Sequence, residues 1–164
     1  MKMTRQSILG FMQGYLAAYG QSGQDGALPE RMSQYFTPDF AFTGYLGLPE
    51  PVVYRGRDTF LARGAMHPSS YERLTPEEMT IDETQQTVFA VIKFEFIDRQ
   101  TGDVLAVERG ATLYQLALGE DRGIRIKSFI FFPQRVAPGI LTGFDVFQRD
   151  SRSSDSPKRH MQAD

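Results

Sequence analysis

The sequence predicts an α+β domain in which an antiparallel sheet packs against N-terminal helices. Near the N-terminus, apolar residues recur at the spacing of amphipathic helices. From residue 87 onward, three long stretches alternate in polarity and are rich in β-branched and aromatic residues, which indicates strands joined by tight turns. One face of this sheet is almost entirely apolar, so we expect helices to cover it.

Length and composition indicate one domain with a core of its own. The chain has 164 residues, and its 41% hydrophobic and 23% charged content is ordinary for a globular protein. We expect the domain to span residues 1–149. Residues 150–164 contain no large apolar side chain except Met161, so we expect a disordered C-terminal tail.

Charge and cysteine content argue against several classes of partner and chemistry. The net charge is −2 and no basic run stands out, so a nucleic-acid partner is not expected. The absence of Cys excludes disulfides, a thiol nucleophile and a Cys-ligated metal, and we expect neither a metal nor a cofactor. No apolar run is long enough to cross a membrane. These features fit a reducing cytoplasm, which is the expected location.

Three helices are expected in the first part of the chain. The first runs from about Thr4 to Gly20. The second opens at 28–30, where Pro is tolerated in the first turn, and ends at 37–39 before a strand. The third begins at 56–58. The apolar face of the first helix consists of Ile8, Met12, Tyr15, Leu16 and Tyr19.

Strand patterns occupy most of the remaining chain. A short strand is expected over 40–45, followed by a loop over 46–54 that could cover a cavity. Residues 74–82 predict a strand that bends at Pro76. The three long strands that follow are expected at 87–97, 104–118 and 124–132.

Two glycine-containing turns set the expected pairing of the long strands. We place Asp98 opposite Asp103 and Gly119 opposite Ile124. The resulting inner face is apolar except for three polar residues. A slip of one residue would exchange the two faces of a strand. The three polar exceptions are Arg109, Gln115 and Ser128.

The same pairing places aromatic residues on the outer face of the sheet. Tyr114, Phe129 and Phe131 are assigned there, close to Lys93 and Glu108. Exposed aromatics would form an adhesive patch, so we expect a second copy of the chain to cover them. The sequence therefore predicts a homodimer through the outer sheet face.

Arg109 is the sharpest candidate for a functional residue. An unpaired guanidinium on an apolar face is costly, so it would hold a carboxylate or an enolate-like oxygen of a ligand. The alternative is a rim position in which Arg109 reaches water or pairs with an Asp from a helix, such as Asp58. Gln115 and Ser128 would be polar anchors in the same cavity, or would simply bond to each other near the sheet edge.

Tyrosines and one histidine complete the candidate site. Tyr15, Tyr45 and Tyr54 would line the cavity mouth as hydroxyl donors, although such tyrosines also occur as ordinary core residues. His67 could act as a general base, but it could equally be a surface residue beside Pro68. The candidates for catalysis are therefore Arg109, His67 and Tyr15.

Two stretches, at 35–42 and 54–60, carry a family resemblance. The first has an aromatic residue followed by Thr-Pro-Asp-Phe, and the second has Gly-Arg-Asp opening a helix. Residues 4–135 resemble the nuclear transport factor 2-like superfamily, in particular its SnoaL-like and ketosteroid-isomerase-like branches. The resemblance implies a cone-shaped half-barrel, a pocket between the sheet and the helices, and frequent dimerisation through the outer face.

The resemblance leaves two functions open. The acids that isomerases of this fold use have no counterpart in 40–45 or in 111–115, and SnoaL-like cyclases use a His and an Asp, whereas His67 is the one His outside the tail. The first hypothesis is a SnoaL-like cavity protein for a small hydrophobic, oxygenated molecule. If it is an enzyme, it is a cofactor-free isomerase, cyclase or dehydratase. The alternative is a non-catalytic ligand-binding or dimeric interaction module.

Overall fold

The computed structural model describes residues 3–46, 48–63 and 69–134. The predicted tail and the last part of the predicted domain lie outside these ranges. The elements are α1 (Arg5–Asp25), α2 (Leu28–Met32), the short 3₁₀ helix η1 (Ser33–Tyr35), β1 (Phe36–Gly44), β2 (Val52–Arg55), α3 (Arg57–Arg63), β3 (Ser70–Asp82), β4 (Thr87–Asp98), β5 (Val104–Leu118) and β6 (Ile124–Pro133).

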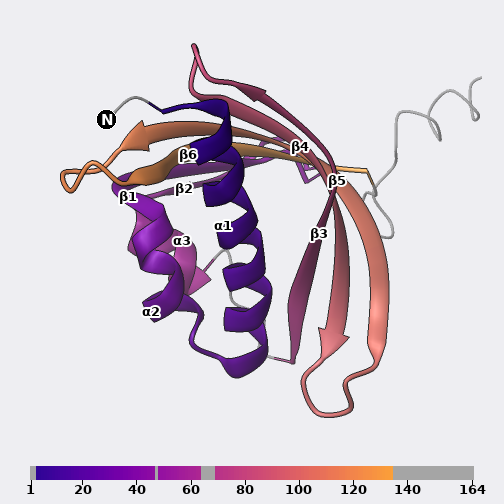
Figure 1. The fold of residues 1–164 in the computed structure, drawn as a ribbon. Coiled ribbons are helices and arrows are strands. Elements are labelled where there is room, and N and C mark those ends of the chain that lie inside the picture. The colour runs from indigo at the N-terminus through magenta and orange to yellow at the C-terminus, as the bar shows by residue number, and fades with distance from the viewer. Residues whose placement is uncertain (1–2, 47, 64–68, 135–164) are drawn as a thin grey trace, which may run out of the picture.

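The strands form one six-stranded sheet in the order β2-β1-β6-β5-β4-β3. Its open, curled surface holds α1 on the concave side, with α2 and α3 beside it (Figure 1). The α+β, cone-like prediction is confirmed. The sheet is mixed rather than purely antiparallel, because β1 runs parallel to β6. β2 is an additional strand inside the segment predicted to be a loop.

Helix α1 begins where the sequence predicts, because Thr4 and Ser7 form a reciprocal capping box. Its predicted end at Gly20 is wrong. The helix continues to Asp25 and stops at Gly26, whose φ of 76° is left-handed. Gly23 lies inside the helix, where α1 approaches β3 closely. A glycine suits this position because an added Cβ would lie 3.0 Å from the Cβ of Tyr71.

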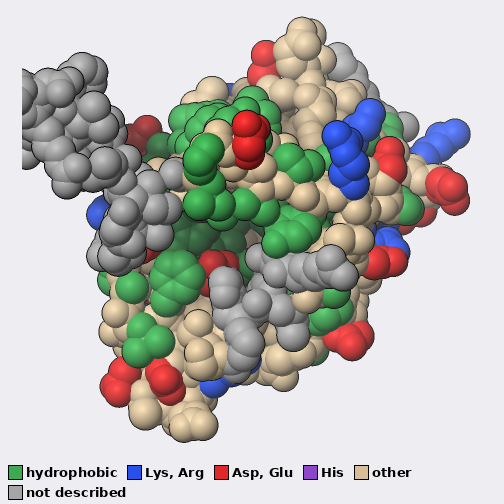
Figure 2. Space-filling model, turned by 180° about the vertical axis from the view of Figure 1, so that it is seen from behind, with side chains coloured by type: hydrophobic (Ala, Val, Ile, Leu, Met, Phe, Trp, Pro, Cys, Tyr) green, Lys and Arg blue, Asp and Glu red, His purple; other side chains and the backbone are tan. Residues whose placement is uncertain are grey.

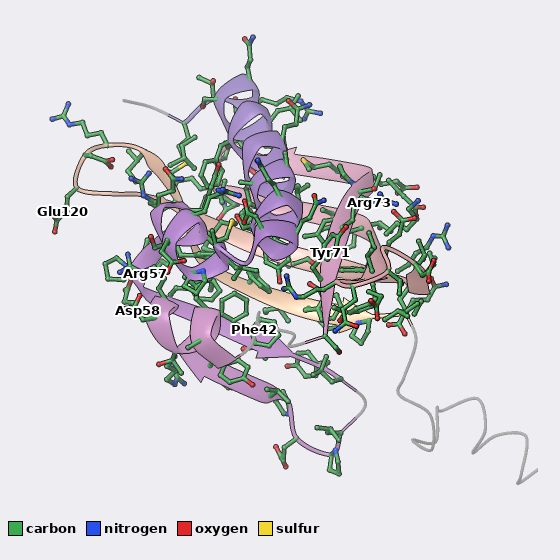
Figure 3. All side chains as sticks on the ribbon, turned by 90° about the horizontal axis from the view of Figure 1, so that it is seen from below. Phe42, Arg57, Asp58, Tyr71, Arg73 and Glu120 are labelled. Carbon is green, nitrogen blue, oxygen red and sulfur yellow. The ribbon has the colours of Figure 1, made fainter. Side chains whose placement is uncertain are left out.

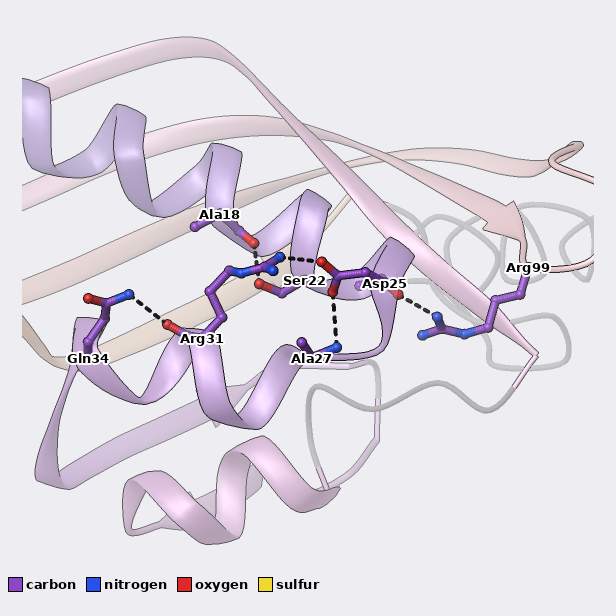
Figure 4. A network of polar contacts seen from close by, with 8 residues as sticks. Ala18, Ser22, Asp25, Ala27, Arg31, Gln34 and Arg99 are labelled. Atoms are coloured by element: carbon purple, nitrogen blue, oxygen red, sulfur yellow. Dashed lines mark hydrogen bonds and ion pairs between the residues drawn. The ribbon is translucent and has the colours of Figure 1, made fainter.

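Polar contacts tie two other parts of the fold to the C-terminal end of α1 (Figure 4). Arg31 of α2 forms an ion pair with Asp25 at 2.6 Å, and Asp25 also accepts a hydrogen bond from the backbone N–H of Ala27 at 3.0 Å. Arg99, at the β4–β5 turn, donates to the carbonyl of Gly23. The guanidinium carbon of Arg99 lies 5.9 Å from the ring centroid of Tyr71. These contacts hold α2 and the β4–β5 turn against the C-terminal end of α1.

An aromatic cluster holds β1, α3 and β6 together beneath the helices. The rings of Phe36 and Phe40 lie 4.6 Å apart, and Phe60 of α3 lies 5.0 Å from Phe40 and 5.5 Å from Phe129. Figure 3 shows Phe42 on the inner side of the sheet, beneath the helices. Edge-on and tilted ring pairs of this kind add to the gain from burial, so the cluster forms one end of the core.

Two β-bulges alter the faces that the sequence predicts. Ile97 pairs with Val104 as expected, but Phe96 pairs with Ala106, so Leu105 has no opposite residue. In the second hairpin, Leu116 pairs with Ile126 and Gln115 with Ser128, so Lys127 is the extra residue. Each bulge shifts the alternation by one residue, and therefore exchanges the side chains that face the helices.

The face assignment for β5 and for the end of β6 was therefore wrong. Tyr114 and Phe129 are buried against the helices, and Phe131 also lines the interior. They cannot form the predicted dimer surface. Arg109, Gln115 and Ser128 belong to the rows of the outer face, although Gln115 and Ser128 are opposite each other as predicted.

No helix in the described part of the chain is both long and apolar enough to span a bilayer. The expected cytoplasmic location stays a prediction.

The close approach of α1 to β3 predicts opposite effects at two glycines of this helix. Gly23→Ala should lower the free energy of unfolding by about 1 kcal/mol, because pressing the new methyl against a Cβ fixed to the β3 backbone costs more than the helix propensity of Ala returns. Gly10→Ala is the matched control. Nothing lies within 4 Å of its Cβ position, so it should raise that free energy by about 0.5–1 kcal/mol. Urea denaturation measures both, and equal effects would contradict this packing.

Candidate functional site

A cavity of about 520 Å³ lies between the inner sheet face and the helices. Figure 2 shows a hollow surrounded by hydrophobic side chains, with acidic atoms inside it. Tyr15 and Tyr19 of α1, Phe60 of α3 and side chains from every strand line the wall. The strand and loop residues are Phe42, Leu46, Val52, Tyr54, Glu72, Leu74, Phe94, Phe96, Glu108, Arg109, Thr112, Tyr114, Phe129, Phe131 and Pro133.

Three buried tyrosines supply phenol groups to this cavity. Tyr15 and Tyr19 are four residues apart on α1, so both point to the sheet, and the Tyr15 ring lies 5.9 Å from that of Tyr114. The neighbouring Tyr114 contributes, after burial, to the raised pKa of Tyr15. Loss of solvation raises the pKa of all three phenols, so they remain neutral hydrogen-bond donors.

Two carboxylates reach the same cavity. Glu72 accepts a hydrogen bond from the Tyr19 hydroxyl at 3.0 Å, and its charge contributes, after burial, to the raised pKa of Tyr19. Glu72 pairs with Phe96 across β3 and β4, and Glu108 pairs with Phe94 across β4 and β5. The wall therefore combines carboxylates with phenols, and these two kinds of group are sufficient to move a proton within one site.

Sequence reasoning missed both acids for different reasons. Glu108 was assigned to the outer face, and the Leu105 bulge turns it inward. Glu72 lies before the predicted start of the strand at 74, whereas β3 begins at Ser70. A strand beginning earlier would have placed Glu72 on the same face as Leu74, which was the available signal.

Arg109 borders the cavity but does not project into it as a free cation. Its side chain is 49% exposed, and its Nε donates to both carboxylate oxygens of Glu77, at 3.1 and 2.8 Å. This contact lowers the pKa of Glu77. The acidic partner of Arg109 is Glu77 of β3, and not a helix residue such as Asp58, which pairs with Arg57 at 2.8 Å.

The structure places the other candidate residues at different sites, and only some of them border the cavity. Tyr54 joins Tyr15 at the cavity wall. Gln115 instead donates to the backbone carbonyl of Gln85 at 3.0 Å, in the turn before β4. Tyr45 is 49% exposed and stacks on Phe132 outside the cavity, with ring centroids 5.1 Å apart. Ser128 is half-buried in the same row as Gln115. His67 lies outside the described residues.

A glycine on β5 shapes one wall of the cavity. A Cβ at Gly110 would lie 2.4 Å from the ring of Phe131, which is too close for any real contact. Phe131 can therefore lie across β5 and meet Phe94, whose ring is 5.2 Å away. The cavity keeps an aromatic wall here because position 110 has no side chain.

Comparison with known proteins identifies the fold. No family model matches the sequence, and no curated protein matches it. Among solved structures, a Methylobium petroleophilum protein of unknown function with a cystatin-like fold is similar over 99% of this chain and 100% of its own, with a TM-score of 0.58 and 19% identity. An NTF2-like superfamily protein from Salmonella enterica is similar over 85% and 100%, with a TM-score of 0.57 and 16% identity.

The chain has a nuclear transport factor 2-like fold. A third similar structure is a Catenulispora acidiphila protein with a ketosteroid isomerase-like fold, in complex with trimethylamine. It covers 77% of this chain and 88% of its own, with a TM-score of 0.52 and 14% identity. At these identities the similarity defines the nuclear transport factor 2-like fold, and the chemistry has to be argued from this chain's own cavity.

Metal ligands do not gather in this cavity. Within residues 3–46, 48–63 and 69–134, no group of three or more His, Cys, Asp or Glu side chains is placed to hold an ion.

The buried tyrosines predict how stability responds to alkaline pH. The unfolded chain releases phenol protons near pH 10, whereas Tyr15, Tyr19 and Tyr114 have a raised pKa in the folded state. The free energy of unfolding should therefore fall as the pH rises above about 10. Phenolate absorbance and far-UV circular dichroism should show these three tyrosines ionising only as the structure is lost.

Tyr114→Phe provides the control for this titration. It should remove about a third of the phenolate absorbance that appears together with unfolding, since it removes one of the three tyrosines that ionise only when the structure is lost. Complete ionisation before any loss of circular dichroism would contradict the burial of these phenols.

Proposed function

We propose that this protein binds a small hydrophobic, oxygenated molecule in the cavity. The observation that carries the proposal is the meeting of buried phenol donors, Tyr15 and Tyr114, with a wall of aromatic rings. A volume of about 520 Å³ is in the range of small-molecule sites. Neutral phenols would donate to a carbonyl or hydroxyl of the ligand, and the rings would bury its carbon skeleton.

The placement of the lining groups favours a binding cavity over a filled core. Polar groups in a protein interior are normally there to bond one another. Here Tyr19 and Glu72 bond each other at 3.0 Å, yet both also border the open volume, as does Glu108. The Catenulispora acidiphila protein in complex with trimethylamine is consistent with a small organic ligand in a fold of this kind.

A second candidate function is cofactor-free proton transfer in the same cavity. The missing acid on the first strand argued against it in the sequence, but Glu72 and Glu108 bring carboxylates to the cavity from other strands. Glu72 would accept a proton from the ligand, and the Tyr15–Tyr114 pair would donate hydrogen bonds to the oxygen where negative charge develops. Isomerisation, cyclisation or dehydration are the reaction classes this would serve.

The alternative from the sequence, a non-catalytic binding or interaction module, differs from this candidate in one measurable respect. A binding module would keep its affinity for a neutral ligand when the acids are replaced, and it would turn over nothing. An enzyme would lose turnover in Glu72→Gln while the cavity still binds.

A cavity-filling pair of variants tests the binding proposal. Leu74 lines the cavity, whereas its neighbour Thr75 is exposed on the opposite face of β3. Leu74→Trp should fill the cavity and remove a bound molecule, and Thr75→Trp should retain it. Native mass spectrometry of freshly purified protein, gentle and then denaturing, reports such a molecule, and para-tert-butylbenzyl alcohol serves as an added probe. Equal binding by both variants would place the ligand elsewhere.

We also propose that the chain forms a homodimer through the outer sheet face, with residues different from those expected. A row that is apolar except for Thr43 crosses the sheet from Phe89 through Leu113, Ile130 and Thr43 to Val53. Phe89, Leu113 and Val53 are 43%, 39% and 45% exposed, and the stacked pair of Tyr45 and Phe132 extends the patch. Apolar surface of this kind favours a covering partner.

Two leucines of equal exposure distinguish an effect at this interface from the general effect of placing a charge on the protein surface. Leu113, in the apolar row, and Leu9, on α1, are both 39% exposed. Leu113→Glu should convert a dimer to a monomer, because it buries a charge at the centre of the interface. Leu9→Glu should leave the dimer intact. Light scattering after size exclusion measures the mass, and a wild-type monomer would disprove the interface.

A further inference from the structure

We propose that Gly44 of β1 and Gly110 of β5 determine how bulky a ligand the cavity accepts, and that this ligand carries an apolar body of ring size beside the oxygen that meets the phenols. The inference rests on the proposed function and adds the size of the ligand to it. It gives a role in specificity to two residues that have no side chain, because each of them allows a ring of the cavity wall to lie away from the phenols.

Two phenylalanine rings of the cavity wall lie against glycine backbone. A Cβ at Gly44 would lie 2.7 and 3.0 Å from two ring carbons of Phe42, and a Cβ at Gly110 would lie within 2.9 Å of two ring carbons of Phe131. Carbon atoms in contact are normally about 3.5–4.0 Å apart. Both rings border the cavity, and both occupy space that a side chain at the glycine position would fill.

The strand pairing shows that both rings lean in the same direction. Phe42 belongs to the row of Tyr114, and Gly44 lies in the next inward-facing row. Phe131 belongs to the row of Gly44, and Gly110 lies one row beyond it in the same direction. Successive inward-facing rows are about 7 Å apart along the strands, so each ring leans toward a row that is further from Tyr114. The three rows are Phe42–Phe129–Tyr114, Gly44–Phe131–Thr112 and Pro133–Gly110.

The space that the two rings leave lies beside the buried phenols. The ring of Tyr114 is 5.9 Å from that of Tyr15 and 5.4 Å from that of Phe129, so the phenols form one end of the aromatic wall. A ligand oxygen that accepts from these phenols would have its apolar body next to this space. The groups that lean away are phenyl rings, and the body that takes their place can therefore be as large as a ring.

A methyl group at either glycine would press its ring back toward the phenols. The closest atoms are the outer carbons of the rings, which move by rotation of the side chain, so the ring yields before the strand does. The ring must retreat by about 1 Å to restore a normal contact, which approaches the length of one C–C bond, about 1.5 Å. The three nearest atoms to a Cβ at Gly44 are all in side chains, whereas a Cβ at Gly110 would also lie 3.2 Å from the carbonyl oxygen of Phe132. Gly44→Ala is therefore the milder of the two substitutions.

A series of cycloalkylmethanols tests the size limit. Cyclopentyl-, cyclohexyl-, cycloheptyl- and cyclooctylmethanol share the same hydroxymethyl group, and each adds one methylene to the ring. Isothermal titration calorimetry of the wild type should show affinity rising about fourfold per methylene while the cavity has room. In Gly44→Ala and in Gly110→Ala, the affinity ratio of cyclooctylmethanol to cyclopentylmethanol should fall by about tenfold, because the larger ring meets the displaced phenylalanine. Cyclopentylmethanol should bind as in the wild type.

Shortening the displaced side chain should reverse the effect. Combining Gly44→Ala with Phe42→Leu, or Gly110→Ala with Phe131→Leu, should recover the wild-type ratio, since leucine lacks the outer ring carbons that the new methyl meets. Gly10→Ala is the control on α1. Nothing lies within 4 Å of its Cβ position, so the ratio should not change.

Each outcome separates the size inference from the proposed function. Binding of cyclopentylmethanol shows that the cavity of a variant is intact, and either glycine suffices for the test because each has its own ring. An unchanged ratio in both alanine variants would overturn the size inference and leave the proposed function standing, as would a lowered ratio that the leucine substitutions do not recover. A wild-type protein that binds none of the four alcohols would overturn both.

Discussion

The bulge at Leu105 is the feature on which the character of the cavity depends. A strand presents alternate residues to opposite faces, so one extra residue reverses every side chain that follows. Beyond this bulge, β5 turns Glu108, Thr112 and Tyr114 toward the helices. Without it, the inner face would carry Leu113 in place of Thr112 and Tyr114, and would be almost wholly apolar. The bulge therefore makes a polar site possible inside an apolar cone.

The helix α1 provides the other half of that site, and its position depends on small residues and on its anchored end. Gly23 lets the helix lie close to β3, where Glu72 accepts from Tyr19. Asp25, Arg31 and Arg99 hold the end of the helix against α2 and the β4–β5 turn. The phenol groups are consequently set on rigid elements rather than on loops, which suits a preorganised site.

The cavity and the outer face divide the chemistry of the sheet between them. The inner side gathers phenols, acids and rings around one volume, and the outer side carries apolar residues together with ion pairs such as those of Arg73 with Glu95 and Arg109 with Glu77. A ligand-binding cavity and a covered outer face are therefore compatible in one domain. The two proposals use separate residues and can be tested separately.

The sequence alone determined the fold class and the start of α1 at Thr4, and it named Tyr15 and Tyr54, which border the cavity. These follow from local signals, namely caps and periodicity. The turn signal placed Gly119 opposite Ile124, whereas Leu118 has that position, so Gln115 and Ser128 are opposite each other only because Lys127 is an extra residue. Only the tertiary structure decided which face of β5 is inside and that Glu72 and Glu108 meet in one cavity. A bulge has no clear local signature, because its extra residue is fixed by pairing with distant strands. Side-chain direction in a sheet is therefore a property of the assembled sheet.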